Sequence, residues 1–151
     1  DPLGIRLADA IQAVFAVSYN IYTHKSQDPT QFVTQVEAFL VDEGYDYKTN
    51  YPVDGKKQKR EFDFRINHRE PAVLLDTVHA NNNAYLRNQA DRVMVNSYEI
   101  SDRDYKQGVI IDDVHGIATD EILEPVDQSL DYFFTWQDKN AIVEEIPPSI
   151  A

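Results

Sequence analysis

The sequence contains no cysteine, and this absence excludes several kinds of site. None of the 151 residues is Cys, so disulfides, thiolate nucleophiles and zinc sites built from cysteine are ruled out. A chain without cysteine is compatible with a reducing compartment. We therefore expect a cytoplasmic protein.

Long apolar runs are also absent. No segment approaches the roughly 20 uninterrupted apolar residues that a membrane-spanning helix needs. The longest apolar stretch, residues 8–22, contains Asp9, Gln12, Ser18 and Asn20, and no basic region precedes it. It is typical of an amphipathic helix and not of a signal peptide. We expect no membrane partner and no targeting signal.

Glycine is scarce, which limits the choice of cofactor. The five glycines form neither a phosphate-binding loop nor a dinucleotide-binding motif. The four histidines are scattered and lack the i, i+4 pairing of a zinc protease. We therefore expect no resident cofactor, except a magnesium ion if the acidic residues described below are active.

Basic residues are few, because 14 Lys and Arg face 26 Asp and Glu and the net charge is −12. A charge of this sign repels nucleic acid at long range. The exception is a basic cluster formed by Lys56, Lys57, Lys59 and Arg60. Two interpretations remain open: a solvated hairpin tip, or a contact surface for nucleic acid.

The length of the chain favours one domain, residues 1–151. The chain begins at Asp1 without a methionine, and its single methionine is Met94. We therefore expect a domain cut from a longer protein, with a neighbouring domain or another protein as its partner.

Hydrophobic periodicity predicts a mixture of helices and strands. Asp28 and Pro29 are typical of the start of a helix, and Gly44 of its end. The predicted elements are helices over 5–22 and 29–43, strands over 45–51, 61–66 and 72–78, a helix over 84–97, a strand over 108–113 and a helix over 125–136. This order, ααβββαβα, predicts an α/β (α+β) fold in which helices flank a mixed sheet of about four strands.

Two of the predicted strands carry an acidic residue among apolar ones. These residues are Asp63 and Asp76. A carboxylate in such a strand is ion-paired, exposed on the polar face of the sheet, or a metal ligand. Carboxylates on adjacent strands can together hold Mg²⁺ for phosphodiester cleavage, so both residues are candidate metal ligands and catalytic residues.

The order of elements resembles the core of the PD-(D/E)XK, or restriction-endonuclease-like, nuclease superfamily. More closely, the chain resembles a bacterial and phage family, domain-of-unknown-function family 1829, over nearly its whole length. The segments that carry this resemblance are 36–40, 62–66, 74–76, 136–139 and 143–145. The resemblance implies a restriction-endonuclease-like fold. Members of family 1829 form the C-terminal half of two-domain proteins, so the resemblance implies a C-terminal domain with an N-terminal domain as its partner. Family 1829 supplies no activity to transfer.

The nuclease superfamily's pattern implies roles for three acids and a lysine. Asp63 matches the first metal ligand and Asp76 the second, while Glu37 matches the auxiliary acid of the preceding helix. The third-strand triplet is Asp76-Thr77-Val78, so valine stands where the superfamily has lysine.

The lysine of that pattern helps to deprotonate the attacking water, and losing a general base costs on the order of 100- to 10,000-fold in rate. Arg87, Gln89 and His79 are the nearest candidates to replace it. The acids also have an ordinary interpretation: Asp63 paired with Arg65, Asp76 near the sheet edge, and Glu37 at the border of an apolar helix face.

Two functions follow from these alternatives. The first is a degenerate nuclease-like domain that no longer cleaves and acts as an interaction or DNA-associated module. The second is a Mg²⁺-dependent DNA endonuclease or phosphodiesterase whose catalytic base has moved. The missing lysine favours the first. Convergence of Glu37, Asp63 and Asp76 on one open cleft would favour the second.

Overall fold

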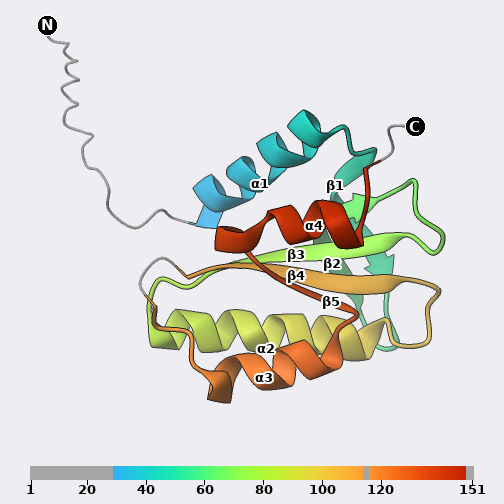
Figure 1. Cartoon of the computed structure of the whole chain (residues 1–151). Helices are drawn as coiled ribbons and strands as arrows, with labels where there is room; N and C mark the ends of the chain where they lie inside the picture. Colours follow the sequence, from blue (N-terminus) through green and yellow to red (C-terminus); the bar gives the residue numbers. More distant parts are fainter. Residues whose placement is uncertain (1–28, 114–115, 149–151) are drawn as a thin grey trace, which may run out of the picture.

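The computed structural model describes residues 29–113 and 116–148, which form three layers with a sheet in the middle (Figure 1). Helices α1 (Pro29–Glu43) and α4 (Asn140–Glu145) cover one face, and α2 (Asn83–Glu99) and α3 (Asp120–Ser129) cover the other. None of these described helices is long and apolar enough to cross a membrane. The predicted helix over 5–22 lies outside the described residues.

The sheet is mixed and has five strands in the order β1-β2-β3-β4-β5. Strand β2 is antiparallel to both of its neighbours, β1 and β3, whereas β4 is parallel to both of its neighbours, β3 and β5. The strands are β1 (Tyr47–Asp54), β2 (Lys59–Ile66), β3 (Val73–His79), β4 (Lys106–Asp112) and β5 (Tyr132–Thr135). The predicted α/β class is confirmed, but the described residues form one strand more than expected.

Helix α1 follows the sequence prediction closely. Pro29 is its first residue, a position where the missing N–H of proline costs no hydrogen bond. Phe32, Val36 and Leu40 are fully buried on one stripe. The helix ends before Gly44, whose φ of 85° is readily adopted only by glycine.

Helix α2 carries both apolar and polar residues toward the sheet. The side chain of Asn82 caps its start by accepting a hydrogen bond from the Tyr85 N–H at 2.8 Å. Leu86 and Val93 are buried, and so is Asn96. A polar residue among these apolar ones needs a buried partner, which the candidate site supplies.

The predicted helix over 125–136 is wrong. Pro125 does not start a helix but lies inside α3, and the following aromatic residues form strand β5. Proline removes one helical hydrogen bond, yet burial of Ile122 and Val126 on the inner stripe holds α3 in place. The run from Tyr132 to Thr135 is rich in aromatic residues, which are enriched in strands.

Two apolar cores lie on opposite faces of the sheet. The core under α1 and α4 includes Phe64, Leu75 and Phe134. The core under α2 and α3 includes Val78, Val109 and Ile111. Successive strand residues point to opposite faces. The polar residues of β3 are therefore also distributed over the two faces of the sheet.

Replacement of Gly108 by alanine tests the packing of the sheet. A Cβ atom at Gly108 would lie 2.9 Å from Leu75 Cδ2 and 2.9 Å from Tyr132 Cβ. We expect Gly108→Ala to lower the free energy of unfolding by about 1–3 kcal/mol, measured by urea denaturation. The exposed Thr49→Ala is the control and should change it by less than about 0.5 kcal/mol. An equally small effect at Gly108 would contradict this packing.

Candidate functional site

Asp63 lies where strands β2 and β3 separate. The two strands pair from Phe64 opposite Leu75 to Ile66 opposite Val73. Beyond this point the Asp63 carboxylate replaces the backbone pairing. Its Oδ2 accepts hydrogen bonds from the Thr77 N–H and from Thr77 Oγ1, both at 2.8 Å. The Asp63 side chain therefore accepts a hydrogen bond from the Thr77 N–H of β3, a group that the backbone of β2 no longer pairs with.

Asp76 is fully buried and held by helix α2. Its Oδ1 accepts a hydrogen bond from Arg92 Nη1 at 3.3 Å, and its Oδ2 accepts one from Asn96 Nδ2 at 2.9 Å. The Asp76 side chain is 0% exposed, whereas that of Arg92 is 30% exposed. A buried carboxylate is tolerated when its charge is paired and its oxygens are hydrogen-bonded, and both conditions are met.

The environment raises the pKa of Asp76 from 3.8 to about 6. Burial is the largest cause, because it disfavours the charged form. The Arg92 charge acts in the opposite direction, while the charge of nearby Asp63 raises the pKa further. The Asp63 carboxylate on β2 is therefore close enough to act on the buried Asp76 of β3.

The polar contacts around Asp76 extend in both directions along α2. Asn96 Oδ1 accepts a hydrogen bond from Arg60 Nε at 2.5 Å. Arg92 also donates to the Thr77 carbonyl oxygen at 3.1 Å and to Gln89 Oε1 at 2.9 Å. We call Arg60, Asp76, Gln89, Arg92 and Asn96 the α2 network. It joins β2, β3 and α2 through hydrogen bonds between these side chains.

Glu37 does not join these aspartates. Its Oε2 accepts a hydrogen bond from the Tyr47 hydroxyl at 2.9 Å, and Tyr47 pairs with Ile66. Ile66 is three residues from Asp63 along β2, or roughly 10 Å at 3.3 Å per residue. Asp76 is held by α2, whereas Glu37 belongs to α1 on the other face (Figure 1). The convergence of the three acids that would favour the nuclease is therefore not observed.

The donor set does not fit a magnesium ion. Mg²⁺ needs near-octahedral oxygen ligands at about 2.0–2.1 Å, but each Asp76 oxygen already accepts a hydrogen bond from α2. Within residues 29–113 and 116–148, no group of three or more His, Asp or Glu side chains could hold a metal ion. The guanidinium of Arg92 places a positive charge where a cation would have to bind Asp76.

None of the three candidates to replace the lysine, Arg87, Gln89 and His79, is free of other partners. Val78 belongs to the apolar core under α2 and α3. Gln89 accepts hydrogen bonds from Arg92, and the exposed Arg87 lies 3.6 Å from Glu121. Gln89 is therefore paired with Arg92, and Arg87 with Glu121. The third candidate, His79, also has another partner.

His79 ends strand β3 as a buried residue, not as part of the following loop as its place in the sequence suggested. Its Nδ1 lies 3.1 Å from Asp112 Oδ2, and Gln137 Nε2 donates to Asp112 Oδ1 at 3.3 Å. Its ring packs against Phe32 of α1. The sequence analysis missed this buried pair, although His79 and Asp112 both directly follow apolar strand residues.

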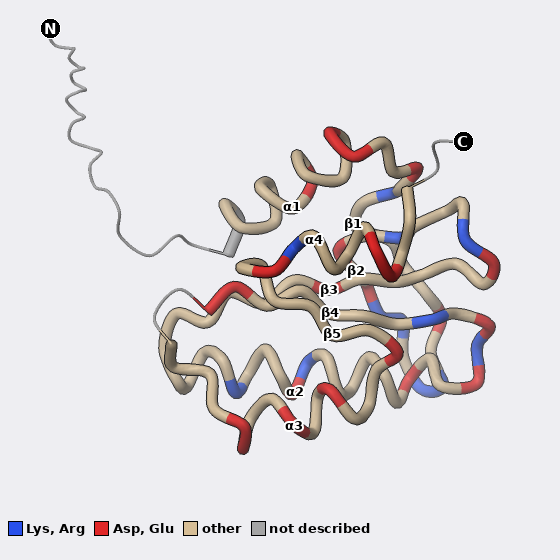
Figure 2. Tube along the Cα trace, viewed as in Figure 1, with Lys and Arg blue, Asp and Glu red and all other residues tan. Residues whose placement is uncertain are grey.

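The basic cluster forms a well-anchored turn between β1 and β2. Lys56, Lys57 and Lys59 are exposed, whereas Arg60 turns inward to Asn96. Glu99 at the end of α2 anchors the turn by accepting a hydrogen bond from the Lys57 N–H at 2.7 Å. Figure 2 shows the basic residues of this turn at one end of the molecule, away from the acidic residues of α3. The turn fits the interpretation as a solvated hairpin tip, and its contact with nucleic acid stays a prediction.

Comparisons with known proteins give one similarity, and it concerns a structure alone. No family model matches the chain, and no curated protein matches it. The chain is similar to the crystal structure of a protein of unknown function, AF1548, with 13% sequence identity and a TM-score of 0.49. The similarity covers 75% of this chain and 64% of that chain, so this chain spans less than two thirds of that protein's length. A likeness at this level supports no statement about function.

The raised pKa of Asp76 predicts a specific dependence of stability on pH. Because the folded pKa of about 6 exceeds the ordinary value of 3.8, the folded state binds more protons than the unfolded state between these values. The contribution of Asp76 to stability is therefore present at acid pH and is lost as the pH rises toward 6.

We expect Asp76→Asn to remove this loss of stability with rising pH. The free energy of unfolding, measured by urea denaturation from pH 4 to pH 7, should fall less with rising pH in the variant than in the wild type. Asp104→Asn, which removes an exposed carboxyl group, controls for the loss of one charge. Parallel profiles for the wild type and Asp76→Asn would contradict the assignment.

Proposed function

We propose that this domain is a nuclease-like scaffold that does not cleave nucleic acid and acts as a binding module. One observation carries the proposal: both oxygens of the buried Asp76 carboxylate are engaged by Arg92 and Asn96. This carboxylate is 0% exposed and paired with a guanidinium, so a hydrated metal ion would have to displace its partners to reach it. The side chain that the superfamily's pattern requires for catalysis thus acts here as part of the packing between α2 and the sheet.

The order of the elements supports the nuclease-like part of the proposal. A helix precedes a three-strand antiparallel meander, and a second helix leads to a strand parallel to the third. This is the arrangement that the resemblance to the restriction-endonuclease-like core implies. The fold alone does not assign an activity, so the proposal of a non-catalytic role rests on the chemistry of the site.

The second candidate is a Mg²⁺-dependent nuclease with a relocated base. The observation in its favour is that Asp63 and Asp76 are close enough for the charge of one to raise the pKa of the other. To become a metal site, the pair would have to release Asp76 from Arg92 and Asn96. Removing the partners of a buried charge is costly, typically about 3–5 kcal/mol for one partner of a pair.

The direct test is titration of the protein with Mg²⁺ and Mn²⁺ by calorimetry, together with a cleavage assay on single- and double-stranded DNA. We expect no cleavage, and no metal binding that differs between the wild type and Asp63→Ala. Asp104→Ala is the matched control for removal of an exposed carboxylate. Cleavage that depends on both the metal and Asp63 would overturn the proposal in favour of the second candidate.

Restoring the lysine at position 78 should not restore a nuclease. Val78 is 2% exposed and packs in the apolar core under α2 and α3, so Val78→Lys would bury an unpaired charge at a cost of several kcal/mol. We expect a large loss in the free energy of unfolding and no cleavage. Glu61→Lys, an exposed site on β2, is the control and should change stability by about 0.5 kcal/mol or less. A stable Val78→Lys protein that cleaves DNA would contradict this account.

A further inference from the structure

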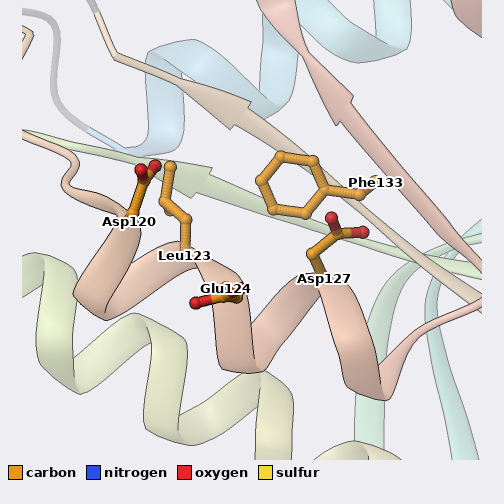
Figure 3. A pocket seen from close by; sticks show the side chains of 5 residues that line it. All are labelled: Asp120, Leu123, Glu124, Asp127 and Phe133. Atoms are coloured by element: carbon orange, nitrogen blue, oxygen red, sulfur yellow. The ribbon is translucent and has the colours of Figure 1, made fainter.

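A pocket with an acidic rim lies between helix α3 and strand β5 (Figure 3). Its volume is about 340 Å³. Its lining residues are Asp120, Leu123, Glu124, Asp127 and Phe133. Leu123, Glu124 and Asp127 follow Asp120 by three, four and seven positions, so the four residues share one face of the helix. Leu123 and the ring of Phe133 supply an apolar floor beside the carboxylates.

The acids of the rim lack cationic partners among the described residues. In that part of the chain no ion pair involves Asp120, Glu124 or Asp127, whereas the neighbouring Glu121 lies 3.6 Å from Arg87. Seven residues separate Asp120 from Asp127, or about 10 Å along the helix axis. This separation is too long for one metal ion, in agreement with the lack of a metal-binding group in the described residues. It suits a row of cationic side chains.

Strand β5 adds a second feature that points to an extended ligand. It is an edge strand, with β4 as its hydrogen-bonded neighbour on one side and no neighbour on the other among the described residues. Such an edge presents backbone N–H and C=O groups that can pair with another chain. Phe133 belongs to this strand and also lines the pocket, so a chain paired with β5 would run beside the pocket.

We propose that this surface binds an extended basic segment of a partner protein, which adds to the sheet beside β5. Side chains on one face of such a strand recur about every 6.6 Å, a spacing that suits lysine or arginine heads facing the three carboxylates. The aliphatic stems of those side chains would cover Leu123 and Phe133. Backbone hydrogen bonds give affinity in this mode of recognition, and the side chains give specificity.

This inference rests on the proposed function as a binding module and names the chemistry of the partner. The probe is a short fluorescent peptide in which lysine alternates with threonine, titrated with the 1–151 chain at low ionic strength. We expect saturable binding that weakens as salt is added. A peptide with glutamate in place of lysine should not bind. A lysine peptide with N-methylated backbone amides should bind more weakly, because it cannot form the strand.

Charge-removing variants separate this surface from general electrostatic attraction. The triple variant Asp120→Asn, Glu124→Gln, Asp127→Asn should lower the affinity about tenfold, since each exposed charge pair contributes about 0.2–1 kcal/mol. The matched control is Asp138→Asn, Glu144→Gln, Glu145→Gln, which changes the net charge equally at exposed positions near α4. It should alter the affinity by less than about twofold.

Equal losses of affinity in the two triple variants, or no loss in either, would overturn the inference. So would binding of the glutamate peptide as tight as that of the lysine peptide. Amide chemical-shift changes should centre on residues 132–135, and changes confined to other strands would also overturn it. These outcomes are distinct from failure of the proposed function, which would appear as metal-dependent DNA cleavage and not as a loss of peptide binding.

Discussion

The packing of α2 against the sheet depends on how the buried charge of Asp76 is satisfied. A fully buried carboxylate on β3 needs donors, and α2 supplies them through Arg92 and Asn96. Asn96 in turn accepts a hydrogen bond from Arg60 of β2. The position of α2 along the sheet is therefore determined by polar contacts as well as by the apolar side chains of Leu86 and Val93, which alone would allow the helix to slide.

The same contacts explain why a nuclease-like arrangement of elements does not provide nuclease chemistry. Asp76 belongs to the packing between β3 and α2, and Val78, two positions further on the same face, belongs to the apolar core. Glu37 contacts Tyr47 at the α1 side of the sheet. The residues that the catalytic pattern would unite are thus divided between two faces, and a row of exposed acids lies elsewhere, on α3.

Much of the fold could be predicted from the sequence, because α1 and the first three strands have clear periods and turn residues. Strand β5 could not, since the aromatic run at 132–135 satisfies a helical stripe as well as a strand. For the site, the predicted strands placed Asp63 and Asp76 on consecutive strands, but the pattern did not show which face Glu37 would reach. Arg92 and Asn96 were missed, although they lie on the apolar side of α2 and so signal a buried polar partner.

The most direct test of the central claim is a ¹³C NMR titration of the Asp76 side-chain carboxyl group, recorded with and without millimolar Mg²⁺. If Asp76 is a buried structural acid, its pKa should be near the value of about 6 that burial gives it, and Mg²⁺ should leave the titration unchanged. A pKa near the ordinary value of 3.8, or a curve that Mg²⁺ shifts to lower pH, would show an accessible metal-binding carboxylate and contradict the account.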